Sequence, residues 1–290
     1  MDMPDGSAGT PRPVGALLRD WRQRRRLTQL DLSCATDIPI RLLCALEKGR
    51  ALPNRDLVLR LADQLEVPLR DCNALLIAAG CAPAFPVRPL DDPAMADTRA
   101  TIELVLAGHE PNPGLAIDRH WVIVASNEVF WDMVAGVDPA LLCPPVNWLR
   151  LALHPAGLAP RIANLRHWRA HMLTRLRRRF EATGDPELAD LVEEIGDYPM
   201  PPALIDGDAE HAAGRVAVPL RLMTVDGPLS FHGTTTVFGS AVDVTLAELT
   251  VEMFFPADPA TATVMRRTAQ GSAVGTTLAT ENAARPAAAG

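Results

Sequence analysis

The stretch from Val14 to Asn54 constrains the fold more than any other part of the chain, because short helical segments follow one another with little room between them. An amphipathic helix carrying Trp21 comes first, Thr28 can cap a second helix, and Pro39 suits the first position of a third. Two short helices joined by a tight turn, after a leading helix, are the order of helix-turn-helix proteins. We therefore predict a helix-turn-helix unit here.

The charge distribution favours a nucleic-acid partner for this segment. Residues 12–60 contain 11 Lys+Arg against 5 Asp+Glu, a balance of +6, whereas the whole chain carries −7, which leaves −13 for the remainder. A basic module attached to an acidic remainder is typical of a DNA-binding unit with a control domain. Charge alone would also fit a solvated basic helix on an ordinary protein.

Several polar side chains are placed to hold such a unit on DNA. Gln29 begins the second helix, where its amide and the helix N-terminus can both meet a phosphate. Arg50 and Arg55 can meet the DNA backbone on the other side. Arg22 and Glu47 can clamp the first and third helices together as an ion pair, although they could also be ordinary surface charges.

The third helix is the expected base reader, with its leucines facing the core. The residues that then face the groove are Ile40, Arg41, Cys44 and Ala45. Of these, Arg41 can donate bidentate hydrogen bonds to a guanine, and Ile40 and Ala45 can contact thymine methyl groups. Because the exposed face of this helix is so apolar, an alternative stays open: the unit is a dimerisation or protein-interaction module with weakened DNA binding.

The rest of the chain divides by composition. We expect a disordered arm at 1–13, the helix-turn-helix domain at 14–82, a Pro-rich linker and connecting helix at 83–112, a second domain at 113–257, and a disordered Ala/Thr/Gly-rich tail at 258–290. The arm lacks the apolar stretch of a signal peptide, and no run approaches the roughly 18 apolar residues of a membrane span. The five cysteines form no CxxC pair, so a reduced, cytoplasmic protein without a metal site is expected.

The second domain reads as α+β. Two short strands are predicted within 115–127 and three more at 215–222, 228–237 and 245–255, with helices at 127–134, 145–154, 160–183 and 185–195 between the two groups. The predicted fold is thus an all-α domain of five helices followed by an α+β domain with a five-stranded antiparallel sheet, which can enclose a cavity against one face.

Candidate ligand contacts in the second domain are aromatic residues for the walls and polar residues for anchoring. They are Trp121, Asn127, Phe130, Trp131, Asn147, Trp148, Arg150 and His154. Arg150 could hold a carboxylate bidentately. Each residue also has an ordinary alternative: the aromatic side chains can be core, the asparagines can cap helices, Arg150 can pair with a carboxylate, and His154 can end a helix.

Two further features of the sequence bear on function, a basic run and the enzyme motifs. A basic run at 175–179, with His167, Arg169 and His171, is either a solvated helix face or a second contact with DNA or an acidic partner. Enzyme motifs are missing: there is no GxSxG, no Gly-rich phosphate loop, and HWRAH lacks the glutamate of HExxH. We therefore expect no catalytic residues and no cofactor.

Several motifs together resemble a known family. The segments are LPNRDLV, ADQLEVPLRDCNALLIAAGCAPAFP, LDDPAM, HEPNPGLAIDRHWVIVASNEVF, NWLRLALHPAGLAPRIANLRHW and VAVPLRLMTVDGPLSFHGTTTVFG. The first unit is similar to Xre-class helix-turn-helix regulators, and the whole of residues 14–256 closely resembles actinobacterial MmyB-like regulators. Three features depart from that pattern: Asp37 stands for the usual turn glycine, Ser33 for an alanine, and Pro39-Ile40 for a more polar start of the reading helix.

The resemblance implies a dimeric transcription factor that recognises an inverted-repeat operator. Its second domain would be PAS-like and would bind a small hydrophobic molecule, with a long-chain fatty acid as the family's precedent. The implied partners are double-stranded DNA, a second copy of the chain, the hydrophobic ligand and RNA polymerase. The departures at the turn and the reading helix bear on the DNA sequence that is preferred rather than on the fold.

Overall fold

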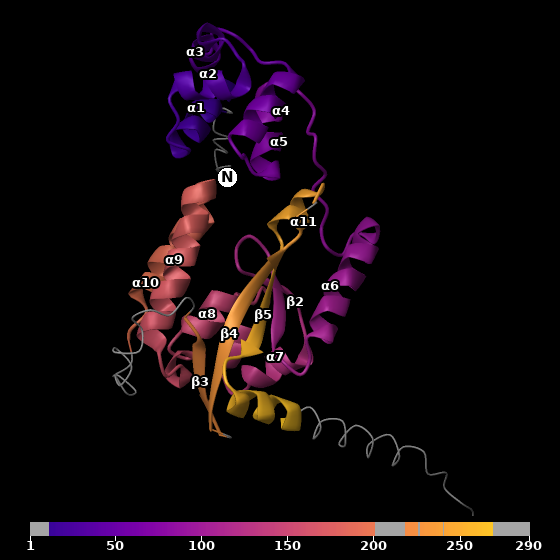
Figure 1. Ribbon diagram of the computed structural model, residues 1–290, viewed down its shortest axis with the longest axis vertical. Helices are drawn as coiled ribbons and strands as arrows, with labels where there is room; N and C mark the ends of the chain where they lie inside the picture. Colours follow the sequence, from indigo (N-terminus) through magenta and orange to yellow (C-terminus); the bar gives the residue numbers. More distant parts are fainter. Residues whose placement is uncertain (1–11, 201–217, 226, 240, 269–290) are drawn as a thin grey trace, which may run out of the picture. The chain divides into compact units, whose positions relative to one another are not determined.

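The computed structural model describes residues 12–200, 218–225, 227–239 and 241–268. The chain divides into two units, the first built mainly from residues up to Arg88 and the second mainly from those that follow (Figure 1). Each unit has a hydrophobic core of its own. Residues 1–11 of the predicted arm at 1–13 and residues 269–290 of the predicted tail at 258–290 lie outside the described residues.

Five helices make up the first unit, in agreement with the sequence-based fold class. They are α1 Val14–Arg24, α2 Gln29–Thr36, α3 Ile40–Glu47, α4 Arg55–Gln64 and α5 Leu69–Ala78. Their apolar stripes meet in one core, in which Trp21, Leu43, Leu46 and Leu61 are buried. The helices begin where the sequence offers a cap: the side chain of Thr28 accepts from the backbone of Asp31 in a capping box.

One glycine sets how closely two of these helices approach. A Cβ atom added to Gly15 on α1 would lie 2.0 Å from the carbonyl oxygen of Leu46 at the end of α3. Such a distance is far shorter than van der Waals contact. The backbones of α1 and α3 can approach this closely only because residue 15 has no side chain. This close packing positions α3 against the rest of the unit.

The remainder of the chain contains the following elements. The helices are η1 Pro93–Met95, α6 Ala96–Gly108, α7 Glu128–Met133, η2 Pro139–Leu142, α8 Trp148–Leu153, η3 Ala159–Arg161, α9 Leu165–Thr183, α10 Pro186–Asp197 and α11 Val244–Glu248. The strands are β1 Gly114–Ile117, β2 Ile123–Ser126, β3 Leu220–Thr224, β4 Gly227–Val237 and β5 Thr250–Pro256. The strands form one antiparallel sheet in the order β2-β1-β5-β4-β3.

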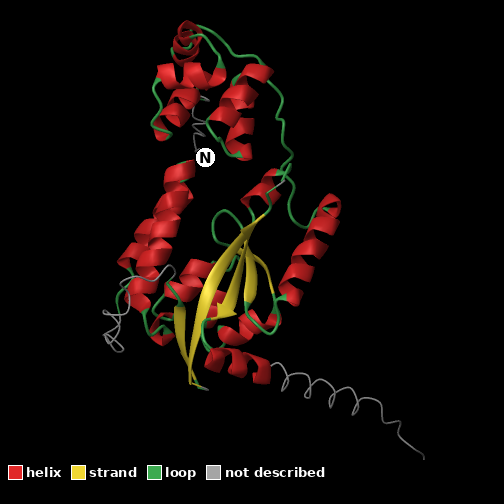
Figure 2. Ribbon diagram, viewed as in Figure 1, coloured by secondary structure: helices red, strands yellow, loops and turns green. Residues whose placement is uncertain are grey.

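The sheet has helices on both of its faces (Figure 2). Alternate side chains point to opposite faces, so Leu115 and Phe254 join the main core with α7, α8 and α9, whereas Ala116 and Val251 pack against α6. The five-stranded antiparallel sheet and the block of helices between β2 and β3 agree with the predicted α+β class. The helix expected to connect the domains is part of the second unit, because its Ile102 is buried against the sheet.

Element boundaries differ from the sequence-based expectation in three places. The predicted strand at 245–255 is instead α11 followed by β5, and the predicted helix at 160–183 starts only at Leu165, because Ile162 forms a bridge with Leu222. Residues 259–268, expected in a disordered tail, form a helix. Thr261 and Met265 are buried along it, and the Thr261 hydroxyl accepts a hydrogen bond from the Ser230 amide at 3.0 Å.

Candidate DNA-reading surface and candidate ligand cavity

A buried ion pair joins α1 to the end of α3. The Arg22 guanidinium donates to Glu47 at 2.6 and 2.8 Å, and it also donates to the Leu27 carbonyl at 2.8 Å. The two side chains are only 11% and 6% exposed. Burial raises the pKa of Glu47, but the hydrogen bonds from Arg22 and Gln29 outweigh burial, so the pKa lies below its ordinary value. The charged pair therefore holds the helices in a defined geometry.

Two residues expected to contact phosphates have protein partners instead. The Gln29 amide donates to Glu47 at 2.8 Å, so in the absence of DNA it extends the ion pair. Arg55 donates to the Ala82 carbonyl at 2.8 Å, which ties α4 to the segment after α5. Sequence reasoning placed both residues on the correct helix ends but could not identify their partners.

The exposed face of α3 carries the predicted reader. Ile40 and Arg41 are exposed and Cys44 and Ala45 are half-buried, with Leu43 and Leu46 in the core as predicted. Leu42, which the sequence analysis did not assign to this face, is 37% exposed. The side chains of Arg41 and Arg50 form no hydrogen bond or ion pair within the described part of the chain.

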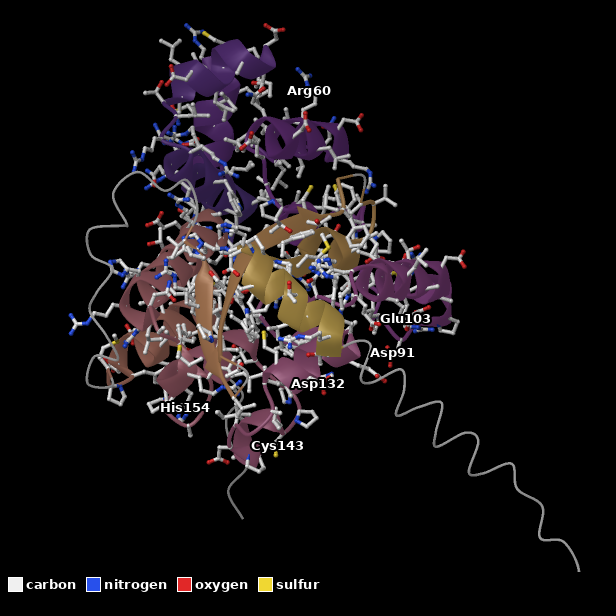
Figure 3. The ribbon with its side chains drawn as sticks, turned by 60° about the horizontal axis from the view of Figure 1, so that its bottom comes forward. Arg60, Asp91, Glu103, Asp132, Cys143 and His154 are labelled. Atoms are coloured by element: carbon white, nitrogen blue, oxygen red, sulfur yellow. The ribbon has the colours of Figure 1, made fainter. Side chains whose placement is uncertain are left out.

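The turn between α2 and α3 has left-handed backbone at Asp37, where φ is 54° and ψ is 28°. This is the conformation for which glycine is usual, and aspartate tolerates it better than most residues. The Ser33 hydroxyl donates to the Ile38 carbonyl at 2.6 Å across the turn. The Arg60 side chain (Figure 3) donates to the Thr36 carbonyl, which ties α4 to the end of α2.

The predicted polar anchors of the second unit are occupied by structural hydrogen bonds. Asn127 accepts from the Gly114 and Phe130 amides and donates to the Leu106 and Asn112 carbonyls, so all of these bonds lie inside the fold. A buried amide with both ends satisfied in this way caps α7 and joins the end of β2 to the start of β1.

The other three predicted polar anchors also form hydrogen bonds or ion pairs within the protein. Asn147 caps α8 and donates to the His120 carbonyl at 2.8 Å. Arg150 forms a bidentate ion pair with Glu194 at 2.7–3.0 Å, which is the alternative to its holding a carboxylate of a ligand. His154 accepts from the Ala156 amide through Nδ1 at 3.0 Å.

The predicted aromatic wall is mostly core. Trp148 contacts Phe130, Trp168 and Phe254 edge-on, with ring centroids 5.4–6.2 Å apart. Trp121 is buried as well, whereas Trp131 is 40% exposed. These rings fill the space beside the sheet by packing on one another.

The basic run on α9 is also partly structural. Arg175 pairs with the buried Glu252, and the buried Arg169 donates to the Ile195 and Gly196 carbonyls at the end of α10. A cation is favourable at the C-terminal end of a helix. In this run Arg177 and Arg178 are exposed.

A cavity of about 760 Å³ lies elsewhere in the second unit, within the usual range for a small-molecule site. Its walls are mostly apolar and come from α7, η3, β3, β4 and helix 259–268. Among the lining residues are Asp132, Met133, Arg161, Leu229, Phe231 and Met265. None of the eight predicted ligand contacts lines it. The sequence signal for this site was the spacing of Thr261, Val264 and Met265, which indicates a helix with one apolar face.

Two absences hold for the described residues. No helix among them has the length and hydrophobicity needed to cross a membrane. Likewise, no group of three or more His, Cys, Asp or Glu side chains in the described ranges is arranged to hold a metal ion.

A basic helical unit whose exposed α3 is held by a buried ion pair, followed by an α+β unit with an apolar cavity, fits the class of transcription regulators that carry a ligand-binding domain. Residues 98–267 match the family model described as "MmyB-like transcription regulator ligand binding domain". The match covers more than half of the chain, so the chain belongs to the MmyB-like transcription regulators, a family of regulators rather than enzymes.

Other comparisons add little. No curated protein matches the chain. Among solved structures, "Structure of an RNA-binding Light-Oxygen-Voltage Receptor" is 13% identical over 94% of this chain, with a TM-score of 0.22. The alignment spans 65% of that structure's chain. At such a score the likeness carries no argument about this chain.

Proposed function

We propose that the first unit binds double-stranded DNA as a homodimer, each copy placing α3 in the major groove at one half of an inverted repeat. Arg41 would contact a guanine, Ile40 and Ala45 thymine methyl groups, and Arg50 a phosphate. The observation that carries this proposal is the exposure of Arg41 and Arg50, without partners in the described chain, beside a helix pair held by a buried ion pair.

The second unit is proposed to be the sensor. Its cavity would take a small hydrophobic molecule, and the family resemblance makes a long-chain fatty acid the first compound to test. A ligand changes DNA affinity only if it binds the two dimer geometries with different affinity. RNA polymerase is a further candidate partner of the DNA-bound protein, and the cytoplasm is its proposed compartment.

The test of DNA binding starts from duplexes selected from a random library by the full chain. Affinity for the selected duplex is then measured by fluorescence anisotropy over a range of salt concentrations. Arg41→Ala should lose about 1–3 kcal/mol of binding free energy and relax the preference at one base pair. The matched control is Arg166→Ala, an exposed arginine of α9, which should bind as the unmodified protein does. An unchanged Arg41→Ala would remove the reading-helix assignment.

A second candidate function rests on the apolar side chains around the reader. Leu30, Ile40 and Leu42 are 60%, 42% and 37% exposed, which is unusual for a surface that contacts DNA alone. In this alternative the unit binds a protein or a second copy. The selection experiment separates the two, because an interaction module would recover no duplex whose affinity falls with salt.

A further inference from the structure

Helix 259–268 forms one wall of the cavity in the second unit. It is the yellow helix that follows β5 in Figure 1, and its Val264, Met265 and Thr268 line the cavity. A surface helix normally turns its whole apolar stripe toward the core. Here the stripe is divided, because Met265 belongs to the main hydrophobic core and also lines the cavity.

This helix has few attachments to the rest of the fold. Within it, Thr261 and Met265 are the buried residues. The Ser230 amide donates to the Thr261 hydroxyl at 3.0 Å, whereas the other side-chain hydrogen bonds of the described helix stay within it or involve its cap, Asp258. A helix shorter than about 12–15 residues is marginal on its own. Its stability therefore depends on packing.

The cavity limits that packing. Side chains that line a cavity have fewer contacts than side chains in a close-packed core. A molecule in the cavity would add contacts to Val264 and Met265 while the helix is docked, and these contacts would be lost if the helix undocked. Such a molecule binds the docked form better, so it shifts the equilibrium between the two forms toward docking.

We infer that helix 259–268 is a movable wall of the cavity, which undocks to admit a hydrophobic molecule and docks against it once it is bound. Binding is thereby converted into a change in the order of the helix that follows β5. This inference rests on the proposed ligand-sensing function and specifies how binding changes the protein. It holds for any apolar molecule that touches Val264 and Met265, whatever its head group.

Hydrogen exchange of the full chain, followed by mass spectrometry, tests this coupling with decanol as an uncharged probe, whose dissociation constant comes from tryptophan fluorescence. Without the probe, the amides of helix 259–268 should exchange faster than those of α10, whose residues do not line this cavity. At about ten times the dissociation constant, exchange in helix 259–268 should slow about tenfold, because only the docked form binds the probe. Exchange in α10 should slow less.

Three variants test the wall without a probe, and circular dichroism shows whether each is folded. Val129→Phe adds a ring at a position of α7 that lines the cavity, and it should slow exchange in helix 259–268 at least about threefold. The matched control Leu104→Phe, at an exposed position of α6, should leave this exchange unchanged. Thr261→Val removes the acceptor of the Ser230 amide and should speed it at least about fivefold.

The outcomes separate this inference from the sensing function. If decanol binds and exchange in helix 259–268 is unchanged, or slows no more than in α10, the movable wall is overturned and the sensing function stands. If decanol does not bind, the sensing of hydrophobic molecules fails. The folded Val129→Phe variant then decides the wall by itself: slower exchange supports it, and unchanged exchange overturns it.

Discussion

Several polar residues that the sequence also allows as ligand contacts form hydrogen bonds within the protein and stabilise its fold. The sequence fits Asn127 and Asn147 either as ligand anchors or as helix caps, and both cap helices in the structure. The two roles need the same residue type, and what separates them is which backbone amides lie within reach. Arg22 and Glu47 are 25 residues apart, and the sequence left their pairing open against two ordinary surface charges, which the contact between α1 and α3 decides.

The first prediction concerns this ion pair. Glu47→Ala leaves the Arg22 guanidinium buried without its anion, and it should lower the free energy of unfolding by about 2–3 kcal/mol, less than the roughly 3–5 kcal/mol of a fully buried pair. The double variant Arg22→Met with Glu47→Leu should cost less than Glu47→Ala alone. Urea unfolding of these variants and of the single variants Arg22→Met and Glu47→Leu gives these values, and additive losses would show that the two side chains do not interact.

A second prediction follows from the lowered pKa of Glu47. A carboxylate whose folded pKa lies below its ordinary value of 4.5 contributes stability that is present above that value and is lost as the pH falls through the folded pKa. The stability difference between the unmodified protein and Glu47→Gln should therefore shrink on acidification below about pH 4.5. Unfolding curves from pH 7 to pH 3 measure it, and a difference independent of pH would contradict the assignment.

At the scale of elements, contacts with neighbouring elements determine where helices form and how closely they pack, more than helix propensity does. The approach of α1 to α3 depends on a glycine, and helix 259–268 exists because Thr261 and Met265 bury against β4 and the cavity. Composition predicted disorder there, since alanine and threonine dominate the segment. Packing on the sheet supplied the stabilisation that composition does not show.

The third prediction concerns Gly15. A methyl group at this position would meet the Leu46 carbonyl, so Gly15→Ala should destabilise the first unit by about 1–3 kcal/mol. Gly108→Ala is the matched control, because a Cβ atom there meets nothing within 4 Å. Thermal unfolding should show a lowered transition for the first variant and an unchanged or raised one for the second. Equal transitions would mean that α1 and α3 lie further apart.

The fourth prediction tests helix 259–268. Thr261→Val removes the acceptor of the Ser230 amide while keeping the side-chain shape, and it should cost about 1–2 kcal/mol. Thr263→Val is the control on the same helix, since the exposed Thr263 hydroxyl donates to the Pro259 carbonyl and accepts from Arg266, both within its own helix. Denaturant unfolding compares the two variants. Equal stabilities would show that helix 259–268 does not pack on β4.

At the scale of the whole molecule, the proposed DNA-binding unit and the ligand-binding domain share one chain. Their coupling requires a dimer whose geometry responds to the cavity, since half-site spacing on DNA is set by the dimer. Native mass spectrometry of the full chain should therefore show a dimer that releases a small apolar acid under denaturing conditions. A ligand-free species would limit the second unit to dimerisation or partner binding, and a monomer would contradict the inverted-repeat operator.

The sequence by itself determined the five helices of the first unit, most elements of the second and the face of α3 that is exposed, because hydrophobic periodicity and caps are local properties. Motifs spread over most of the chain also identified the family. Only the tertiary structure decided where the cavity lies and which charges remain open in it. Arg150 and Arg161 look equivalent in sequence, but Glu194 comes within reach of the first and only carbonyls come within reach of the second. Such differences arise from contacts between distant segments, which no local pattern records.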